Sequence, residues 1–159
     1  MMKYKIICFL IILFSSCNLV NNIIDEITIF GIEGQELYNC DFPEMETYQD
    51  VALYANSVLT WESMPFNPIT SPQEAIEKGK GNCTTYAILF MNVAHFTLGV
   101  DFGFACADAS PYSQRAVLEG GIPDHSMVIL AGQLYSAYTG RPITEYKAGY
   151  YYSFNEVFN

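Results

Sequence analysis

One stretch of the chain, 79–99, constrains the fold more than any other. Two glycines and an asparagine lead directly into Cys83. Apolar residues then recur every three or four positions as far as Leu98, which is the period of a helix. Gly99 is placed to end that helix. We therefore predict a sharp turn followed by a helix whose first turn holds Cys83.

A cysteine at the start of a helix can have either of two roles. The N-terminal end of a helix carries a partial positive charge, which favours the thiolate, and the thiolate is the nucleophilic form of cysteine. The alternative is a small apolar side chain buried at the helix start, because unmodified cysteine is often buried. The spacing of residues around Cys83 leaves both interpretations open.

Composition and charge exclude several classes of protein. The chain has 159 residues, 51% of them hydrophobic and 12 of them tyrosine, which indicates a packed globular fold rather than a disordered chain. Its formal net charge is −10, so nucleic acid would be repelled and is not an expected partner. The two histidines are far apart in sequence and no cysteines stand as a close pair. We expect neither a metal nor a cofactor.

The first 16 residues have the three parts of a secretory signal. Residues 1–5 are short and basic, 6–14 form an apolar run, and two serines precede Cys17. The apolar run is too short to span a bilayer comfortably. Two interpretations of this segment are a simple transmembrane anchor and an ordinary secreted signal; a third, a lipoprotein signal, follows from the residues before Cys17.

Small residues directly before Cys17 resemble the lipobox of bacterial lipoproteins. The resemblance implies cleavage before Cys17 and a lipid on its thiol, which would anchor the protein to a membrane of the bacterial cell envelope. We therefore predict a signal peptide over 1–16, a lipidated tether over 17–47 and a folded domain over 48–159.

Three cysteines remain after the signal and the lipidated residue are set aside: Cys40, Cys83 and Cys106. Three is an odd number, so at least one thiol stays outside any disulfide within the chain, even in an oxidising compartment. A disulfide between Cys40 and Cys106 would leave Cys83 as the cysteine with a free thiol. The sequence does not decide this pairing.

The pattern along the mature chain indicates helices first and strands afterwards. Helices are predicted over 48–61, 72–78 and 83–98. Strands are predicted over 102–107, 125–130, 133–139 and 146–154. A two-residue turn at 131–132 joins the second strand to the third. This order predicts an α+β domain in which the helix after Cys83 packs on an antiparallel sheet.

A cysteine nucleophile needs a base, and the chain offers two histidines. His95 lies in the same helix as Cys83, about 18 Å along its axis, which is too far for contact. His125 begins a predicted strand and is the better candidate. With the two-residue turn, His125 faces Tyr138, whose hydroxyl would hold the imidazole; a loop one residue longer puts Thr139 there instead.

These motifs resemble the nucleophile region of the transglutaminase-like superfamily, closest in style to the bacterial transglutaminase-like cysteine proteinases. The resemblance rests on Pro72-Gln73-Glu74-Ala75-Ile76, on Gly79-Lys80-Gly81-Asn82-Cys83 with the helix that follows, on Asp124-His125-Ser126-Met127-Val128 and on Gly132-Gln133-Leu134-Tyr135. It implies a papain-like α+β core, with Cys83 as the nucleophile and His125 as the base. The chain departs from the family where an orienting Asp is expected, at 137–139, because Tyr138 stands there.

We therefore expect a thiol acyl-transfer enzyme, either a hydrolase or a transferase, acting on a peptide or protein amide; a cell-wall peptide is one candidate substrate. Tyr138 would orient His125. The oxyanion would be held by the Cys83 N–H and a second donor, for which Trp61 and Gln73 are candidates. The alternative is a surface lipoprotein of the same fold that binds a partner and has little or no turnover, because the orienting acid is missing.

Overall fold

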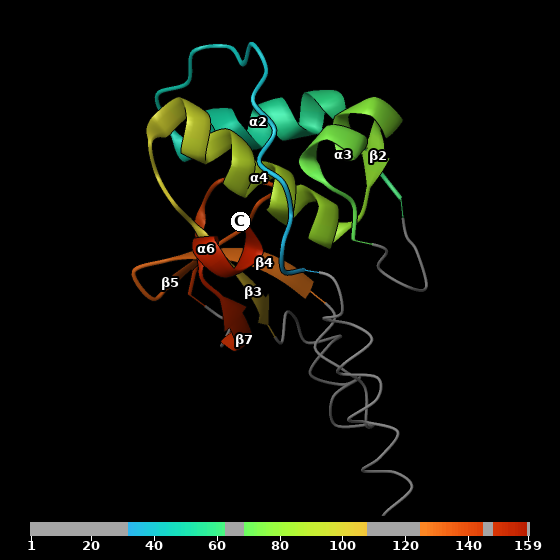
Figure 1. Cartoon of the computed structure of the whole chain (residues 1–159). Helices are drawn as coiled ribbons and strands as arrows, with labels where there is room; N and C mark the ends of the chain where they lie inside the picture. Colours follow the sequence, from blue (N-terminus) through green and yellow to red (C-terminus); the bar gives the residue numbers. More distant parts are fainter. Residues whose placement is uncertain (1–31, 63–68, 108–124, 145–147, 159) are drawn as a thin grey trace, which may run out of the picture. The chain divides into compact units, whose positions relative to one another are not determined.

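The computed structural model describes residues 32–62, 69–107, 125–144 and 148–158, without the side chains of 107, 125 and 148–150. All of these residues belong to one unit of the chain, Gly31–Asn159. The described part contains four helices and a five-stranded antiparallel sheet. The prediction of a mixed α+β domain is therefore confirmed (Figure 1).

Helix α2 spans Tyr48–Val58 and begins where the sequence predicts. The hydroxyl of Thr47 accepts a hydrogen bond from the backbone N–H of Asp50, and the Asp50 carboxylate accepts one from the N–H of Thr47. The helix ends earlier than predicted, because Leu59 is extended and Thr60–Trp61 forms strand β1. This strand pairs in parallel with β2, Lys80–Gly81.

Helix α3 spans Pro72–Lys78, as predicted. Ser71 and Glu74 form a second reciprocal cap, with proline in the first helical position. Gly79 ends the helix in the left-handed conformation, at φ 63°. The chain then passes through β2 into the next helix, which is the turn predicted before Cys83.

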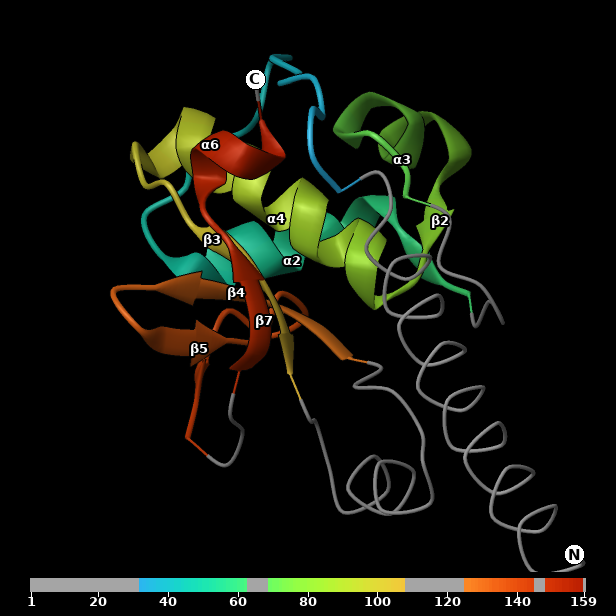
Figure 2. The same cartoon turned by 60° about the horizontal axis from the view of Figure 1, so that its bottom comes forward.

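Helix α4, Cys83–Leu98, is the centre of the domain. Every residue of Cys83–Ala94 is buried, which explains why the helix is apolar around most of its circumference. It contacts α2 and α3 as well as strands β3, Gly103–Ala107, and β4, His125–Leu130. Figures 1 and 2 show the three helices lying over one face of the sheet.

The sheet has the order β6-β5-β4-β3-β7, so β3 and β4 are its central strands. The remaining strands are β5, Gln133–Tyr135, β6, Pro142–Ile143, and β7, Ala148–Tyr152. The last strand, β7, pairs with β3 and forms the edge of the sheet opposite β6. Figure 2 shows β7 beside β3. The predicted final strand is also too long, because the short helix α6 begins at Phe154 and runs to Val157.

The hairpin between β4 and β5 has the predicted two-residue turn, with Leu130 opposite Gln133. Both turn residues have positive φ, 49° at Ala131 and 81° at Gly132, as this tight turn requires. The prediction that β5 continues to Thr139 is wrong. The strand ends at Tyr135, and the N–H of Gly140 donates to the carbonyl of Ser136 at 2.7 Å, which closes a turn.

Residues 32–47, which we placed in the tether, pack onto the domain. The side-chain amide of Asn92, buried in the middle of α4, forms two hydrogen bonds with the backbone of Tyr38, at 2.9 Å and 2.8 Å. The N–H of Gln35 donates to the carbonyl of Val157 at 2.7 Å. The predicted signal peptide and Cys17 lie outside the described residues.

The disulfide between Cys40 and Cys106, which the sequence left open, is not formed. Cys40, Cys83 and Cys106, the three cysteines of the described part, form no disulfide with one another. As for a membrane span, none of the helices that the structure describes is long and apolar enough to cross a bilayer.

Candidate active site

The segment before α4 is packed tightly against the first turn of the helix. A Cβ added to Gly81 would lie 2.5 Å from the Cβ of Thr85, so only glycine fits there. Asn82, also buried, caps the helix: its side-chain oxygen accepts from the backbone N–H groups of Thr84 and Thr85, at 3.1 Å and 3.2 Å. This packing holds the start of α4 in one position.

Cys83 is the first residue of α4, as predicted, and its residue surface is 8% exposed. The first turn of the helix contains no acidic residue that would oppose the partial positive charge of the helix end. The setting therefore suits a thiolate electrostatically. Its burial equally suits the alternative of a packed structural cysteine, so position alone does not decide between them.

A hydrogen bond joins the first turn of α4 to strand β4. The hydroxyl oxygens of Thr84 and Ser126 are 2.8 Å apart, and both side chains are buried. The side chain of Ser126 on β4 therefore reaches the helix start. Sequence reasoning did not single it out, because a serine in a strand carries no signal of its partner on another element.

Cys106 is the cross-strand partner of Ser126, and the Ser126 side chain is close enough to affect the pKa of its thiol. Burial raises the pKa of the Cys106 thiol to about 11; the charge of Cys83 adds to the rise, and the side chain of Ser126 opposes it. Cys106 is therefore protonated at neutral pH. Its electrostatic interaction with Cys83 places the two thiols in the same region of the interior.

The predicted base, His125, is the first residue of β4, and its backbone lies opposite Ala107 on β3. Its side chain lies outside the described residues. The predicted pairing of His125 with Tyr138 across the hairpin is not formed, because β5 ends three residues before Tyr138.

Tyr138 instead belongs to a group of three aromatic rings, which we call the aromatic row: Trp61, Tyr86 and Tyr138. Tyr86 lies in the first turns of α4, and its ring centroid is 6.1 Å from that of Trp61 and 5.2 Å from that of Tyr138. Tyr86 is buried and donates its hydroxyl to the carbonyl of Leu59 at 2.8 Å. The outer two rings are exposed, with 49% of Trp61 and 51% of Tyr138 accessible.

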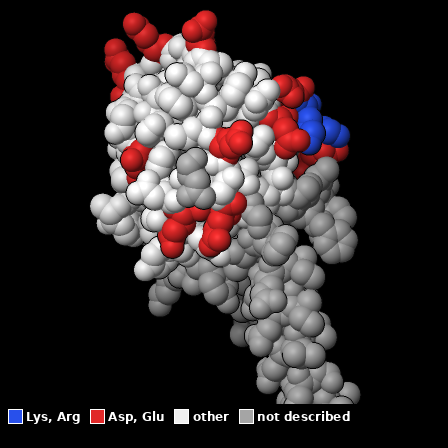
Figure 3. Space-filling model, in the orientation of Figure 1, with Lys and Arg blue, Asp and Glu red and all other residues white. Residues whose placement is uncertain are grey.

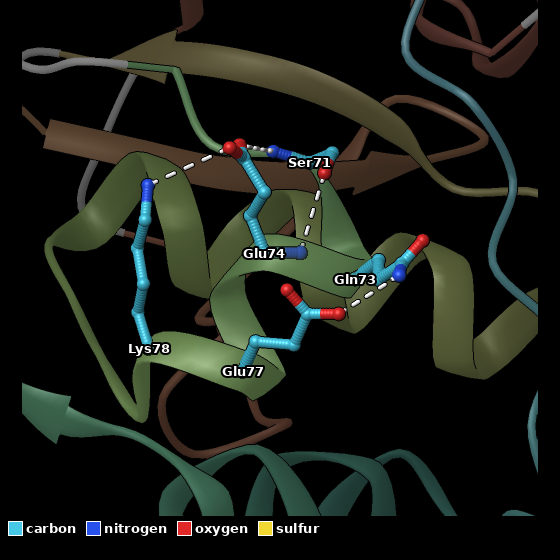
Figure 4. A network of polar contacts seen from close by, with 5 residues as sticks. All are labelled: Ser71, Gln73, Glu74, Glu77 and Lys78. Atoms are coloured by element: carbon cyan, nitrogen blue, oxygen red, sulfur yellow. Dashed lines mark hydrogen bonds and ion pairs between the residues drawn. The ribbon is translucent and has the colours of Figure 1, made fainter.

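Gln73, the other candidate for the oxyanion, is on the outside of α3. Its side-chain amide donates to the Glu77 carboxylate at 2.8 Å, one turn further along the same helix (Figure 4). Gln73 is exposed, so the structure gives it the role of a surface residue. It does not bring this amide toward Cys83.

His95 lies near the C-terminal end of α4, as the helix period predicts. Its Nδ1 is 2.7 Å from a carboxylate oxygen of Asp101, and its ring is stacked on Phe154 of α6. His95 thus joins the end of the helix to the C-terminal segment and has no part in the site around Cys83.

Charged side chains do not assemble into a metal site in the described part. No group of three or more His, Cys, Asp or Glu residues there is arranged to hold a metal ion. On the face shown in Figure 3, acidic side chains are scattered, and the few basic ones lie close to acidic ones. Two such contacts are ion pairs, Lys80 with Glu62 at 3.1 Å and Lys78 with Glu74 at 3.7 Å.

The described site therefore joins Cys83, Thr84, Ser126 and Cys106 at the sheet, with the aromatic row beside the same helix end. Comparison of the chain with models of known protein families, with curated proteins and with solved structures found no match.

Proposed function

We propose that the chain is a transglutaminase-like thiol acyl-transfer enzyme with a papain-like core, held in the bacterial cell envelope by lipid on Cys17. One observation supports this most. The buried bond between the hydroxyls of Thr84 and Ser126 joins α4 to β4, and these residues directly follow Cys83 and His125 in the sequence. The proposed nucleophile and base therefore belong to two backbone segments that are in contact.

In the proposed reaction, His125 takes the proton from the Cys83 thiol, and the thiolate attacks the carbonyl carbon of a peptide amide. The carbonyl oxygen becomes an oxyanion near the backbone N–H of Cys83, since the N–H groups of Thr84 and Thr85 donate to the Asn82 cap. His125 then gives its proton to the leaving amine as the C–N bond breaks, and the acyl group remains on Cys83 as a thioester. Attack by water completes hydrolysis, and attack by a second amine completes transfer.

The aromatic row supports a role in substrate contact. Trp61 and Tyr138 come from separate parts of the chain and expose about half of their surface on either side of Tyr86, which is three residues after Cys83. Exposed aromatic rings of this kind are enriched at binding surfaces. We assign Trp61 and Tyr138 to binding of the substrate beside the nucleophile, and no longer to the oxyanion or to orienting His125.

A second candidate function is a binding lipoprotein of the same fold without turnover. Two observations favour it: Cys83 is buried, and a tyrosine stands where the family has its orienting acid. In such a protein the aromatic row would contact a partner, and the thiol would only fill space in the core.

Alkylation of Cys83 as a function of pH separates the two functions. Iodoacetamide labelling of the intact protein, read separately for each cysteine by peptide mass spectrometry, would cover about pH 5 to about pH 9. If the protein is an enzyme, Cys83 should be labelled at pH values well below the ordinary thiol midpoint of about pH 8.5. His125→Ala should then slow the labelling of Cys83 by about tenfold or more.

His95→Ala is the matched control. It removes the chain's only other histidine, which lies in α4 near the end opposite Cys83. It should leave the labelling of Cys83 unchanged. An ordinary midpoint for Cys83 that is indifferent to His125 would exclude the enzyme and leave the binding lipoprotein.

A further inference from the structure

Three polar side chains are buried between α4 and the central strands of the sheet. Thr84 is 4% exposed, Ser126 5% and Cys106 8%, and we call them the hydroxyl–thiol chain. Their neighbours along the same strands, Phe104 and Val128, are buried and apolar. Valine or alanine in these positions would fill a comparable volume without any polar atom to satisfy.

The hydroxyl–thiol chain crosses three elements in two steps. The oxygens of Thr84 on α4 and Ser126 on β4 are 2.8 Å apart. Ser126 also lies opposite Cys106, its cross-strand partner on β3, whose thiol it influences. The middle member, Ser126, thus lies between the other two, and loss of its bond to Thr84 would leave a buried hydroxyl unsatisfied.

Stability alone is a weak reason for this arrangement. A hydrogen bond between buried neutral groups contributes only about 1 kcal/mol net, and apolar groups of the same shape can do as well. A directional bond differs from apolar packing in one respect: it fixes the separation of the two atoms it joins. The hydrophobic effect, by contrast, is non-directional.

We infer that Ser126, through its bond to Thr84, is a positioning residue that sets the start of α4 against the start of β4. The inference rests on the proposed function, because the two residues that it aligns are Cys83 and His125, each one position earlier in the chain. Proton transfer between a thiol and an imidazole requires hydrogen-bond distance. A shift of about 1 Å at such a pair can cost about a hundredfold in rate.

The test compares Ser126→Ala and Thr84→Val with the unchanged chain, using the same pH-resolved labelling of Cys83. Either variant removes the bond between the helix and the strand. We expect labelling of Cys83 at about pH 6.5 to fall by about tenfold to a hundredfold, with its midpoint moving up toward that of an ordinary thiol. Thr84→Ser, which keeps the hydroxyl, should retain the unchanged chain's profile.

Thr97→Val is the matched control. The Thr97 hydroxyl donates to the Val93 carbonyl at 2.8 Å on the same helix, away from the sheet contact, so its loss should leave the midpoint unchanged. Thermal unfolding followed by circular dichroism reports whether each variant is folded at the labelling temperature. The double variant of Thr84→Val and Ser126→Ala should be no worse than either single variant, because both remove one bond.

Two different results separate failure of this inference from failure of the proposed function. The first result is that His125→Ala raises the pH midpoint of Cys83 labelling, while the folded Ser126→Ala and Thr84→Val variants have the midpoint of the unchanged chain. In that case Ser126 has only a structural role, and the proposed enzymatic function is still supported. If the unchanged chain already shows an ordinary midpoint that ignores His125, the proposed function fails and this inference fails with it.

Discussion

The two ends of helix α4 are built in different ways. At the C-terminal end Gly99 closes the helix at φ 63° with no atom near a hypothetical Cβ, and His95 pairs with the half-exposed Asp101. At the N-terminal end the cap, the thiol and the threonine hydroxyl are all buried, and Gly81 is in close contact with the helix.

This difference agrees with the position of the proposed reactive site. Polar groups in an interior cost free energy unless each is hydrogen-bonded, so an ordinary helix end leaves them in water. The C-terminal end of α4 follows that rule. The N-terminal end brings four polar side chains into the core, Asn82, Cys83, Thr84 and Thr85. Buried polar groups in one place are what a preorganised reactive site requires.

Substitution of the glycine at each end of α4 tests this difference most directly. Gly81→Ala would place a methyl group 2.5 Å from the Thr85 side chain, so the loop or the helix start must move. We expect a loss of about 3 kcal/mol in the free energy of unfolding. Gly99→Ala meets no neighbour and should cost only about 1 kcal/mol, because a positive φ is strained for alanine. Urea unfolding of both variants measures this, and equal losses would show that the two ends are equally tolerant.

A second prediction concerns alkaline pH. The folded pKa of Cys106, about 11, exceeds the reference value of 9.0, so the folded state keeps a proton that the unfolded chain has lost. Stability therefore falls as pH rises from about 9 to about 11, by roughly 2–3 kcal/mol for this group.

Cys106→Ala should flatten that part of the stability curve, measured by urea unfolding at several pH values. Cys40→Ala is the matched control at a less buried thiol, whose pKa is also raised by burial and by Asp41. Its effect on the curve should be smaller. An alkaline slope that is the same with and without the Cys106 thiol would contradict the burial of this group.

The smallest effect is expected at the C-terminal end. Asp101→Asn removes the charge that faces His95, and both side chains are partly in solvent. A pair of this kind is worth about 0.5 kcal/mol, so the variant should unfold at nearly the same urea concentration as the unchanged chain. A loss of more than about 2 kcal/mol would show that this end too depends on a specific polar contact.

Local signals predicted the helices well. Thr47 with Asp50 and Ser71 with Glu74 form their reciprocal caps, and Gly79 and Gly99 end helices as expected. The two-residue hairpin turn also forms as predicted. All of these depend on residues within four positions of one another, where backbone conformation and short side-chain bonds decide the outcome.

Some long-range details differ from the predictions. The extension of β5 to Tyr138 is wrong because the chain turns at Ser136, where Gly140 comes close to the backbone of Tyr48. The sequence also did not predict that the backbone of Tyr38, in the segment assigned to the tether, bonds to Asn92, 54 positions away. No pattern in the sequence around either of the contacting residues predicts such a contact.

The residues around Cys83 are enough to specify the helix that begins there, its cap and its end, because these follow from backbone preferences and local hydrogen bonds. The order of helices and strands likewise indicates the α+β class. The packing of distant elements, in contrast, brings Ser126 to Thr84 and Tyr138 to the side of Tyr86, and it places the last strand next to β3. These contacts depend on how whole elements pack and on the register of the strands, which are long-range properties that a residue's neighbours in sequence do not specify.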